Sequence, residues 1–258
     1  MEFNLKAIVR YDGTDFAGWQ VQPDKRTVQG EIEHALSQIA SQPVRIQGAG
    51  RTDAGVHALG QVFSCCWPKE LDAERLHRSL SSILRPEIRV ESLEIVPPGF
   101  NARFSAKSKR YAYAVSLTRE PDPLSARYAW CVPWKLDIGR LGELAASLVG
   151  THDFAGFQCS GSDTQTTVRT LYSVEVNPGG IVGPCDARDL YRLELSGDGF
   201  LYKMVRNIAG LLVDIARGAV LEERFLEVLN GPAPFRGHTA PARGLALMEV
   251  LYYTQRLK

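Results

Sequence analysis

Residues 48–61, GAGRTDAGVHALGQ, contain four glycines and a single acidic residue, Asp53. The flanking segments PVRIQGAG (43–50) and QVFSCCW (61–67) are strand-like, so we expect the glycine-rich stretch to turn tightly between two strands. Glycine permits positive φ angles and the close approach of another chain. A lone aspartate in such a loop either caps the turn with its own side chain or performs chemistry, and the stretch alone leaves both readings open.

Strand-like and amphipathic helical segments surround this loop. Strands are predicted at 4–13, 88–96 and 109–117, and helices at 27–40 and 72–84. In the first helix Thr27 is a plausible N-cap, and Ile32, Ala35, Leu36 and Ile39 form an apolar stripe at helical spacing. Because strands arrive in pairs between helices, the pattern favours an α+β fold with a mainly antiparallel sheet over a doubly wound parallel sheet.

The second half of the chain has a similar order of predicted helices and strands. Helices are predicted at 136–150, 200–218 and 221–231, and strands at 168–177, 189–197 and 244–253. A proline-rich segment at 119–134 separates the halves, which gives two α/β units, residues 1–118 and 119–258. No flexible linker joins them, so we expect the halves to share a sheet or to pack tightly. Segments 158–167 and 177–188 are expected to be surface loops.

Composition excludes several classes of protein. The chain has 258 residues, 45% of them hydrophobic, and a formal net charge of +1, which is typical of a globular protein. No apolar run reaches the length of a membrane span, and no basic region precedes an apolar core at the N-terminus, so we expect no membrane association and a cytoplasmic location. Five scattered cysteines without metal-ligand spacing indicate reduced, mostly buried thiols and no metal site.

Motifs of several enzyme classes are also missing from the sequence. There is no nucleotide-binding P-loop, no GxGxxG after a strand, no HExxH and no GxSxG. Residues 97–119, in contrast, contain Arg103, Lys107, Lys109, Arg110 and Arg119 and no acid. This asymmetry indicates a polyanionic partner, although a solvated basic face gives the same pattern.

Two further positions are candidates for recognition or chemistry. Tyr111 follows the basic run, where its ring either packs in the sheet or stacks on an extruded base. Lys203, Arg206 and Asn207 lie near a predicted helix start, which favours an anion, although Arg206 could instead extend its charged end from a buried helix. For His57 and His152 we expect a structural or RNA-backbone role, because no nucleophile or base is spaced around them.

Seven motifs occur in order along nearly the whole chain. They are YDGTDFAGWQVQ (11–22), TVQGEIEHAL (27–36), GRTDAGVHALGQV (50–62), FNARFSAKSKRYAY (100–113), GTHDFAGF (150–157), GDGFLYKMVRNIAG (197–210) and APARGLALMEVLY (240–252). Together they resemble the tRNA pseudouridine synthase A family. The resemblance implies two RNA-recognition-like halves related by pseudo-twofold symmetry, which share an extended antiparallel sheet with flanking helices and form a basic cleft.

The resemblance also implies the partners of the protein. The substrates are uridines 38, 39 and 40 of the tRNA anticodon stem-loop, and each tRNA contacts both subunits of a homodimer. No metal and no organic cofactor is implied. The reaction is the isomerisation of a flipped uridine to pseudouridine.

Site residues follow from matching positions in these motifs. Asp53 matches the catalytic aspartate, Arg206 the arginine that pairs with it, and Tyr111 the tyrosine that stacks on the target base. Arg51 matches an RNA-contacting arginine, and Leu245 an apolar residue of the uracil pocket. Weaker matches as RNA contacts are Gln20, Lys107 and Lys109.

Three points stay open at the level of sequence. The carboxylate of Asp53 attacks C6 of the base, attacks C1′ of the ribose, or acts as a base on the sugar. The same catalytic residues also suit a synthase of other RNA or other tRNA positions. A non-catalytic RNA-binding protein on this scaffold is the remaining alternative, and the presence of both Asp53 and Arg206 favours the enzyme.

Overall fold

The computed structural model describes residues 3–70, 72–120, 122–123, 126–159, 161, 164–182, 189–230 and 237–252. The chain forms two compact units. The first comprises residues up to Lys107 together with the C-terminal segment from Leu247, and the second comprises Ser108–Ala246.

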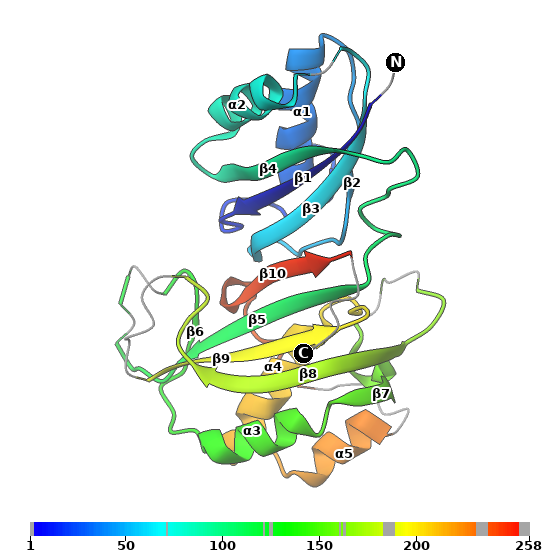
Figure 1. Ribbon diagram of the computed structural model, residues 1–258. Coiled ribbons are helices and arrows are strands. Elements are labelled where there is room, and N and C mark those ends of the chain that lie inside the picture. The colour runs from blue at the N-terminus through cyan, green and yellow to red at the C-terminus, as the bar shows by residue number, and fades with distance from the viewer. Residues whose placement is uncertain are drawn as a thin grey trace. The chain divides into compact units, whose positions relative to one another are not determined.

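The first unit contains a mostly antiparallel arrangement of strands with two helices (Figure 1). Its elements are β1 (Phe3–Tyr11), α1 (Val28–Ala40), β2 (Gln47–Gly48), β3 (His57–Trp67), α2 (Ala73–Leu84) and β4 (Ile88–Val96), completed by β10 (Leu245–Leu251), which begins at the end of the second unit. The strand order is β4-β1-β3-β10, and β2 pairs with β3.

Alternation along β1 gives the first unit its core. Leu5, Ala7 and Val9 are buried, while the residues between them are partly exposed, as expected when one face of a strand meets the core. Helices α1 and α2 contact each other, and α2 contacts β4 (Figure 1). Thr27 caps α1 as predicted, because its hydroxyl accepts the N–H of Gly30 at 3.2 Å.

The second unit is also mixed α and β (Figure 1). Its elements are β5 (Ser108–Ser116), β6 (Trp130–Cys131), α3 (Ile138–Ala146), β7 (Gly150–Asp153), the 3₁₀ turn η1 (Phe154–Phe157), β8 (Val168–Pro178), β9 (Leu190–Gly197), α4 (Met204–Ala216), α5 (Glu223–Asn230) and the 3₁₀ turn η2 (Ala242–Gly244). The strand order is β5-β9-β8-β7 with antiparallel pairs, and the short β6 pairs with β5 in parallel.

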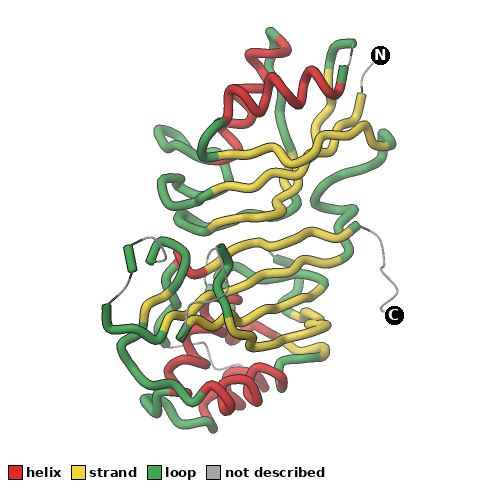
Figure 2. The backbone as a smooth tube through the Cα atoms, turned by 60° about the vertical axis from the view of Figure 1, so that its left-hand side comes forward, coloured by secondary structure: helices red, strands yellow, loops and turns green. Residues whose placement is uncertain are grey.

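Helix α4 forms the centre of the second unit. It is buried on almost all sides, which is typical of a helix enclosed by other elements rather than one that lies on a surface. Helix α3 contacts both α4 and β8. Fully buried rings of Phe154, Phe157 and Phe225 fill the space beside α4 and α5. Figure 2 shows the helices of this unit, in red, gathered along one side of its strands.

The fold class predicted from the sequence is confirmed. The chain is mixed α and β, with a large and mostly antiparallel sheet and, within the described residues, five α-helices. The predicted strand at 43–50 is much shorter in the structure. Only Gln47–Gly48 of this segment pairs as a strand. The expected surface loops fall partly outside the described residues, at 160, 162–163 and 183–188.

The cysteines in the described ranges form no disulfide, and Cys65 is the only buried one among them, fewer than the sequence predicts. Cys65, Cys66, Cys131 and Cys159 are free thiols, and Cys185 lies outside the described residues. Burial is the main reason that the pKa of Cys65 is raised to about 12. None of the helices in the described ranges has both the length and the apolar composition that a bilayer crossing requires.

Candidate active site

Asp53 lies in the loop between β2 and β3, as the sequence predicted. The side chain is half-buried, and the backbone carbonyl of Asp53 accepts the N–H of Val56 at 3.1 Å. Gly55 has a φ of +78°, which closes the turn in a conformation that favours glycine. Asp53 therefore occupies a tight turn whose backbone is defined by a local hydrogen bond.

The residue before the aspartate is anchored through two of its atoms. Thr52 is only 6% exposed. Its hydroxyl lies 2.8 Å from the hydroxyl of Tyr11, and its carbonyl accepts the N–H of Trp19 at 3.0 Å. Burial raises the pKa of Tyr11 to about 12, so this phenol stays neutral at physiological pH and keeps its proton for hydrogen bonding. These bonds fix the peptide that leads into Asp53.

Two glycines allow this close approach. Gly18 has a φ of +98°, and a Cβ at this position would lie 2.8 Å from the Thr52 carbonyl oxygen and 3.2 Å from the Asp53 carbonyl carbon. A Cβ at Gly48 would lie 2.5 Å from the ring of the buried Trp19. The segment around Gly18 therefore packs directly against the backbone of the aspartate loop, without space for a side chain.

The N-terminus of α1 holds this supporting segment in place. The N–H groups of Val28 and Gln29 donate to the carbonyls of Gly18 and Trp19 at 3.1 and 3.0 Å. These helix donors have no partner within the helix itself. The helix start and the aspartate loop are therefore connected through two residues, Gly18 and Trp19.

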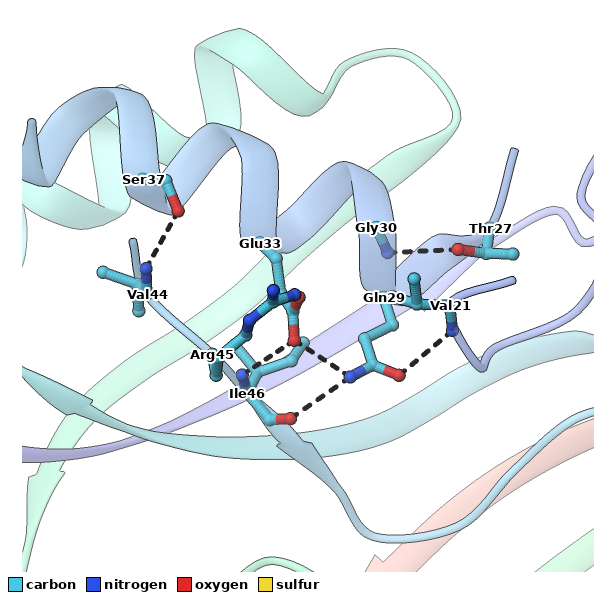
Figure 3. A network of polar contacts seen from close by, with 9 residues as sticks. All are labelled: Val21, Thr27, Gln29, Gly30, Glu33, Ser37, Val44, Arg45 and Ile46. Carbon is cyan, nitrogen blue, oxygen red and sulfur yellow. Dashed lines mark hydrogen bonds and ion pairs between the residues drawn. The ribbon is translucent and has the colours of Figure 1, made fainter. Parts of the chain in front are cut away.

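Side chains of α1 also hold the chain segment that enters the loop (Figure 3). The carboxylate of Glu33, only 7% exposed, accepts the N–H of Ile46 at 3.1 Å and an N–H of the Arg45 guanidinium at 2.6 Å. The amide of Gln29 donates to Glu33 at 2.9 Å, and its oxygen accepts the N–H of Val21 at 3.3 Å (Figure 3). A buried carboxylate with this many donors is a satisfied structural group.

Both motif histidines make structural contacts. His57 is 1% exposed, and its Nδ1 lies 3.1 Å from the N–H of Gly13 and 3.2 Å from the carboxylate of Asp12. Nε2 of His152 lies 3.2 Å from the Val149 carbonyl oxygen. His57 therefore connects the turn after β1 to the end of the aspartate loop.

The structure brings together two of the residues predicted to contact RNA. Nε of Arg51 donates to the side-chain oxygen of Gln20 at 3.1 Å, and both side chains are exposed. Lys107 is also exposed, and its backbone N–H donates to Leu251 at 2.8 Å. The aspartate loop and the neighbouring segment at Gln20 thus present a cation and an amide to solvent on the same unit, which suits contact with phosphate or ribose.

Tyr111 and Lys109 lie on β5 in the second unit. Tyr111 is 8% exposed and pairs with Leu195 of β9, and its ring meets the ring of Phe200 edge-to-face with centroids 4.9 Å apart. Lys109 pairs with Gly197 and is partly exposed. A ring supported in this way has a fixed orientation, which a stacking surface requires.

Arg206 extends from the first turn of α4. Its Nε donates to the carbonyl of Ala240 at 2.8 Å, and its own carbonyl accepts the N–H of Ala240 at 3.1 Å. The next residue, Asn207, is 1% exposed, and its side chain bonds the Phe157 carbonyl and the Thr239 hydroxyl. The N-terminal end of α4 and the segment at 239–240 are therefore tied together at several points.

Leu245 begins β10 directly after η2. It is 7% exposed, and its N–H donates to the Ala242 carbonyl. The preceding Gly244 lies against Tyr113, whose hydroxyl donates to the Pro241 carbonyl at 2.8 Å. Burial raises the pKa of this phenol. The backbone before Leu245 is thus held from β5.

Comparison with known proteins connects these features. A family model described as tRNA pseudouridine synthase matches residues 7–105 and 144–253, which include the aspartate loop, α4 and β10. The chain belongs to this family. As a family member it is an isomerase that converts uridine to pseudouridine in tRNA.

Full-length relatives agree with this assignment. A tRNA pseudouridine synthase A of Lacticaseibacillus casei is 41% identical over 252 residues, which cover 96% of this chain and 99% of the relative. Proteins of the same name from Bacillus subtilis and Syntrophotalea carbinolica are 39% and 38% identical, covering 96% and 97% of this chain and 98% and 97% of the relatives.

Sequence reasoning missed the residues that support the aspartate. Tyr11, Gly18 and Trp19 belong to a motif used only to recognise the family, and no role was assigned to them. Gly18 and Trp19 lie in a segment without helical or strand periodicity, whereas Tyr11 lies near the end of the predicted strand at 4–13. A glycine in a segment of this kind is typical of close packing against another backbone.

Gly18→Ala tests whether this support matters for catalysis. The added Cβ meets the backbone of the aspartate loop at a φ of +98°, so we expect a loss of about 1–3 kcal/mol in the free energy of unfolding. We also expect the rate of pseudouridine formation to fall by up to about 100-fold through displacement of Asp53. Urea unfolding and single-turnover assays on tRNA measure the two effects.

Gly142→Ala is the matched control for this substitution. A Cβ at Gly142, within α3, meets no atom within 4 Å. Stability should stay the same or rise, and the rate should be unchanged. A Gly18→Ala variant as fast as the wild type would show that the loop does not depend on this contact.

Proposed function

We propose that this chain isomerises uridines 38, 39 and 40 in the anticodon stem-loop of tRNA, with Asp53 as the reacting carboxylate. The observation that carries the proposal is the aspartate loop, whose backbone is held by Thr52, Gly18 and the α1 start. A rigid support of this kind is what a positioned reactive group requires. The reaction is inferred from family membership. The anticodon stem-loop as substrate is inferred from the resemblance of the sequence motifs.

The proposed reaction needs a flipped nucleotide. The C1′–N1 bond breaks, the base turns, and C1′ bonds to C5, while C5 loses a proton and N1 gains one. Atoms and electrons balance without an added reactant, because the product is an isomer. Flipping costs a few kcal/mol and is cheapest where pairing is weak, as at the end of a stem.

The other motif residues have separate roles in this proposal. Tyr111 stacks on the flipped base and assists proton transfer, Arg206 keeps the aspartate ionised and oriented, and Leu245 lines the uracil pocket. Supporting features are the fixed ring of Tyr111 and the anchoring of Arg206 to Ala240. Arg51, Gln20, Lys107 and Lys109 contact the RNA.

We further propose how the chain is organised for this task. Residues 1–118 carry the catalytic aspartate, and residues 119–258 complete the RNA-binding cleft. The active species is a cytoplasmic homodimer in which each tRNA contacts both subunits. These statements rest on the motif resemblance.

Mapping pseudouridine in unmodified tRNA transcripts tests the function. After incubation with the protein, carbodiimide treatment and reverse transcription should give new stops one nucleotide 3′ of positions 38–40. Asp53→Asn should bind tRNA with unchanged affinity, yet its rate should fall by at least about 100-fold, because the amide can neither attack nor accept a proton.

Asp24→Asn is the control for the loss of one negative charge. Asp24 is exposed with a φ of 58°, a conformation that asparagine adopts readily. Its activity should equal that of the wild type. Stops at other uridines would reject the proposed positions, and turnover by Asp53→Asn would reject the role of the carboxylate.

The salt dependence of tRNA binding tests the basic contacts. The logarithm of the association constant should fall linearly with the logarithm of salt concentration, and Lys107→Ala should reduce the slope by about 1. Lys69→Ala, at another exposed lysine outside the basic segment, should leave the slope unchanged. An affinity independent of salt would contradict a phosphate-binding surface.

Sedimentation equilibrium tests the homodimer. The particle should have twice the 28.5 kDa mass of the chain at the concentrations used for the activity assay. A monomeric mass under these conditions, with activity intact, would remove the second subunit from the proposal.

A further inference from the structure

The segment between β4 and β5 displays one large apolar side chain to solvent. Phe104 is 77% exposed, whereas Phe100, four residues earlier, packs its ring 4.9 Å from the ring of Tyr252. Leaving a phenylalanine in water forfeits most of the free energy that its burial would provide. The ring of Phe100 is therefore part of the packing, whereas the ring of Phe104 faces solvent.

The segment that carries Phe104 is anchored at several points, although it contains no regular secondary structure. The side-chain amide of Asn4 donates to the carbonyls of Pro97 and Phe100 at 2.8 and 2.9 Å. Ala102 is fully buried, its N–H bonded to Ser64 at 3.0 Å and its carbonyl to the Tyr252 hydroxyl at 2.8 Å. Side chains of β1 and β3, and of the residue that follows β10, thus hold the backbone.

A hydrogen-bonded turn then orients the residues at its tip. The side-chain oxygen of Asn101 accepts the N–H groups of Arg103 and Phe104 at 2.9 and 3.1 Å. Asn101 and Ser105 close the turn, since the N–H of each bonds to an oxygen of the other at 3.0 and 2.9 Å. The exposure of Phe104 is therefore built into a defined turn rather than into a loose loop.

The charge around the exposed ring favours one class of partner. The guanidinium of Arg103 lies 5.5 Å from the Phe104 ring centroid, and within the described part of the chain Arg103 makes no ion pair. Lys107 is exposed nearby in sequence, and no acid occurs between residues 97 and 119. An apolar protein partner does not need this many cations, whereas a nucleic acid offers both bases and phosphates.

We propose that Phe104 and Arg103 form a second RNA-contact site, a platform on which an unpaired base of the substrate tRNA stacks while Arg103 binds an adjacent phosphate. The proposal rests on the proposed function, because it adds a contact to the same substrate. Stacking tolerates every base, so the platform contributes affinity and register rather than sequence selection.

Three substitutions of Phe104 test the platform by measuring the Kd for an unmodified tRNA transcript at fixed salt. Phe104→Ala should bind about 5- to 150-fold more weakly, the range for loss of one base–aromatic stack. Phe104→Trp should retain wild-type affinity, whereas Phe104→Leu should remain weak because it lacks an aromatic face. The thermal midpoint should be unchanged for all three, because the ring is mostly exposed and is not part of the core.

Leu221→Ala is the control, because Leu221 is 78% exposed and lies outside the basic segment. It should leave the Kd unchanged. Rescue by leucine, an unchanged Kd for Phe104→Ala, or a changed sedimentation mass of Phe104→Ala with normal tRNA binding would each overturn the platform. Failure of the proposed function has a different signature, since the wild-type protein would then form no pseudouridine while the Kd comparison still decides the role of Phe104.

Discussion

The hydrogen bonds between the first amides of α1 and the carbonyls of Gly18 and Trp19 are the constraint on which the aspartate loop depends. A helix start has donors that must find partners outside the helix. Here they fix two residues, and one of these, Trp19, uses its own N–H to hold the carbonyl of Thr52. The backbone that leads into Asp53 is therefore held by main-chain groups at the start of α1, acting through Gly18 and Trp19.

Most regular elements could be predicted from the sequence because their periodicities are strong. Helix α1 shows its stripe in Ile32 and Leu36, and its N-cap in Thr27. The segment 43–50 failed as a strand for a specific reason. The N–H groups of Val44 and Ile46 bond to side chains of α1, Ser37 and Glu33, instead of to a neighbouring strand. Strand propensity does not indicate that side chains of the preceding helix will accept the hydrogen bonds of these N–H groups.

Some residues of the candidate site could likewise be predicted from the sequence, and others could not. Asp53, Arg51 and Tyr111 could be named as candidates because they belong to specific motifs, whereas the hydrogen bond between Arg51 and Gln20 becomes visible only in the folded chain. Tyr11 and Phe104 could not be assigned from periodicity. Tyr11 acts through its buried hydroxyl, and Phe104 through its exposed ring. Both properties arise only when segments far apart in sequence are packed together.

The contacts around the aspartate loop have a consequence for the order of folding. Those that hold Thr52, Gly18 and Gly50 join residues between Tyr11 and Gln61. These separations, up to the 41 residues between Tyr11 and Thr52, are far smaller than those that join β3 to β10, so they cost less loop-closure entropy. The support of the Asp53 loop can therefore form on the ribosome once α1 and β3 have emerged, before synthesis reaches β10, the strand that completes the first unit from the far end of the chain.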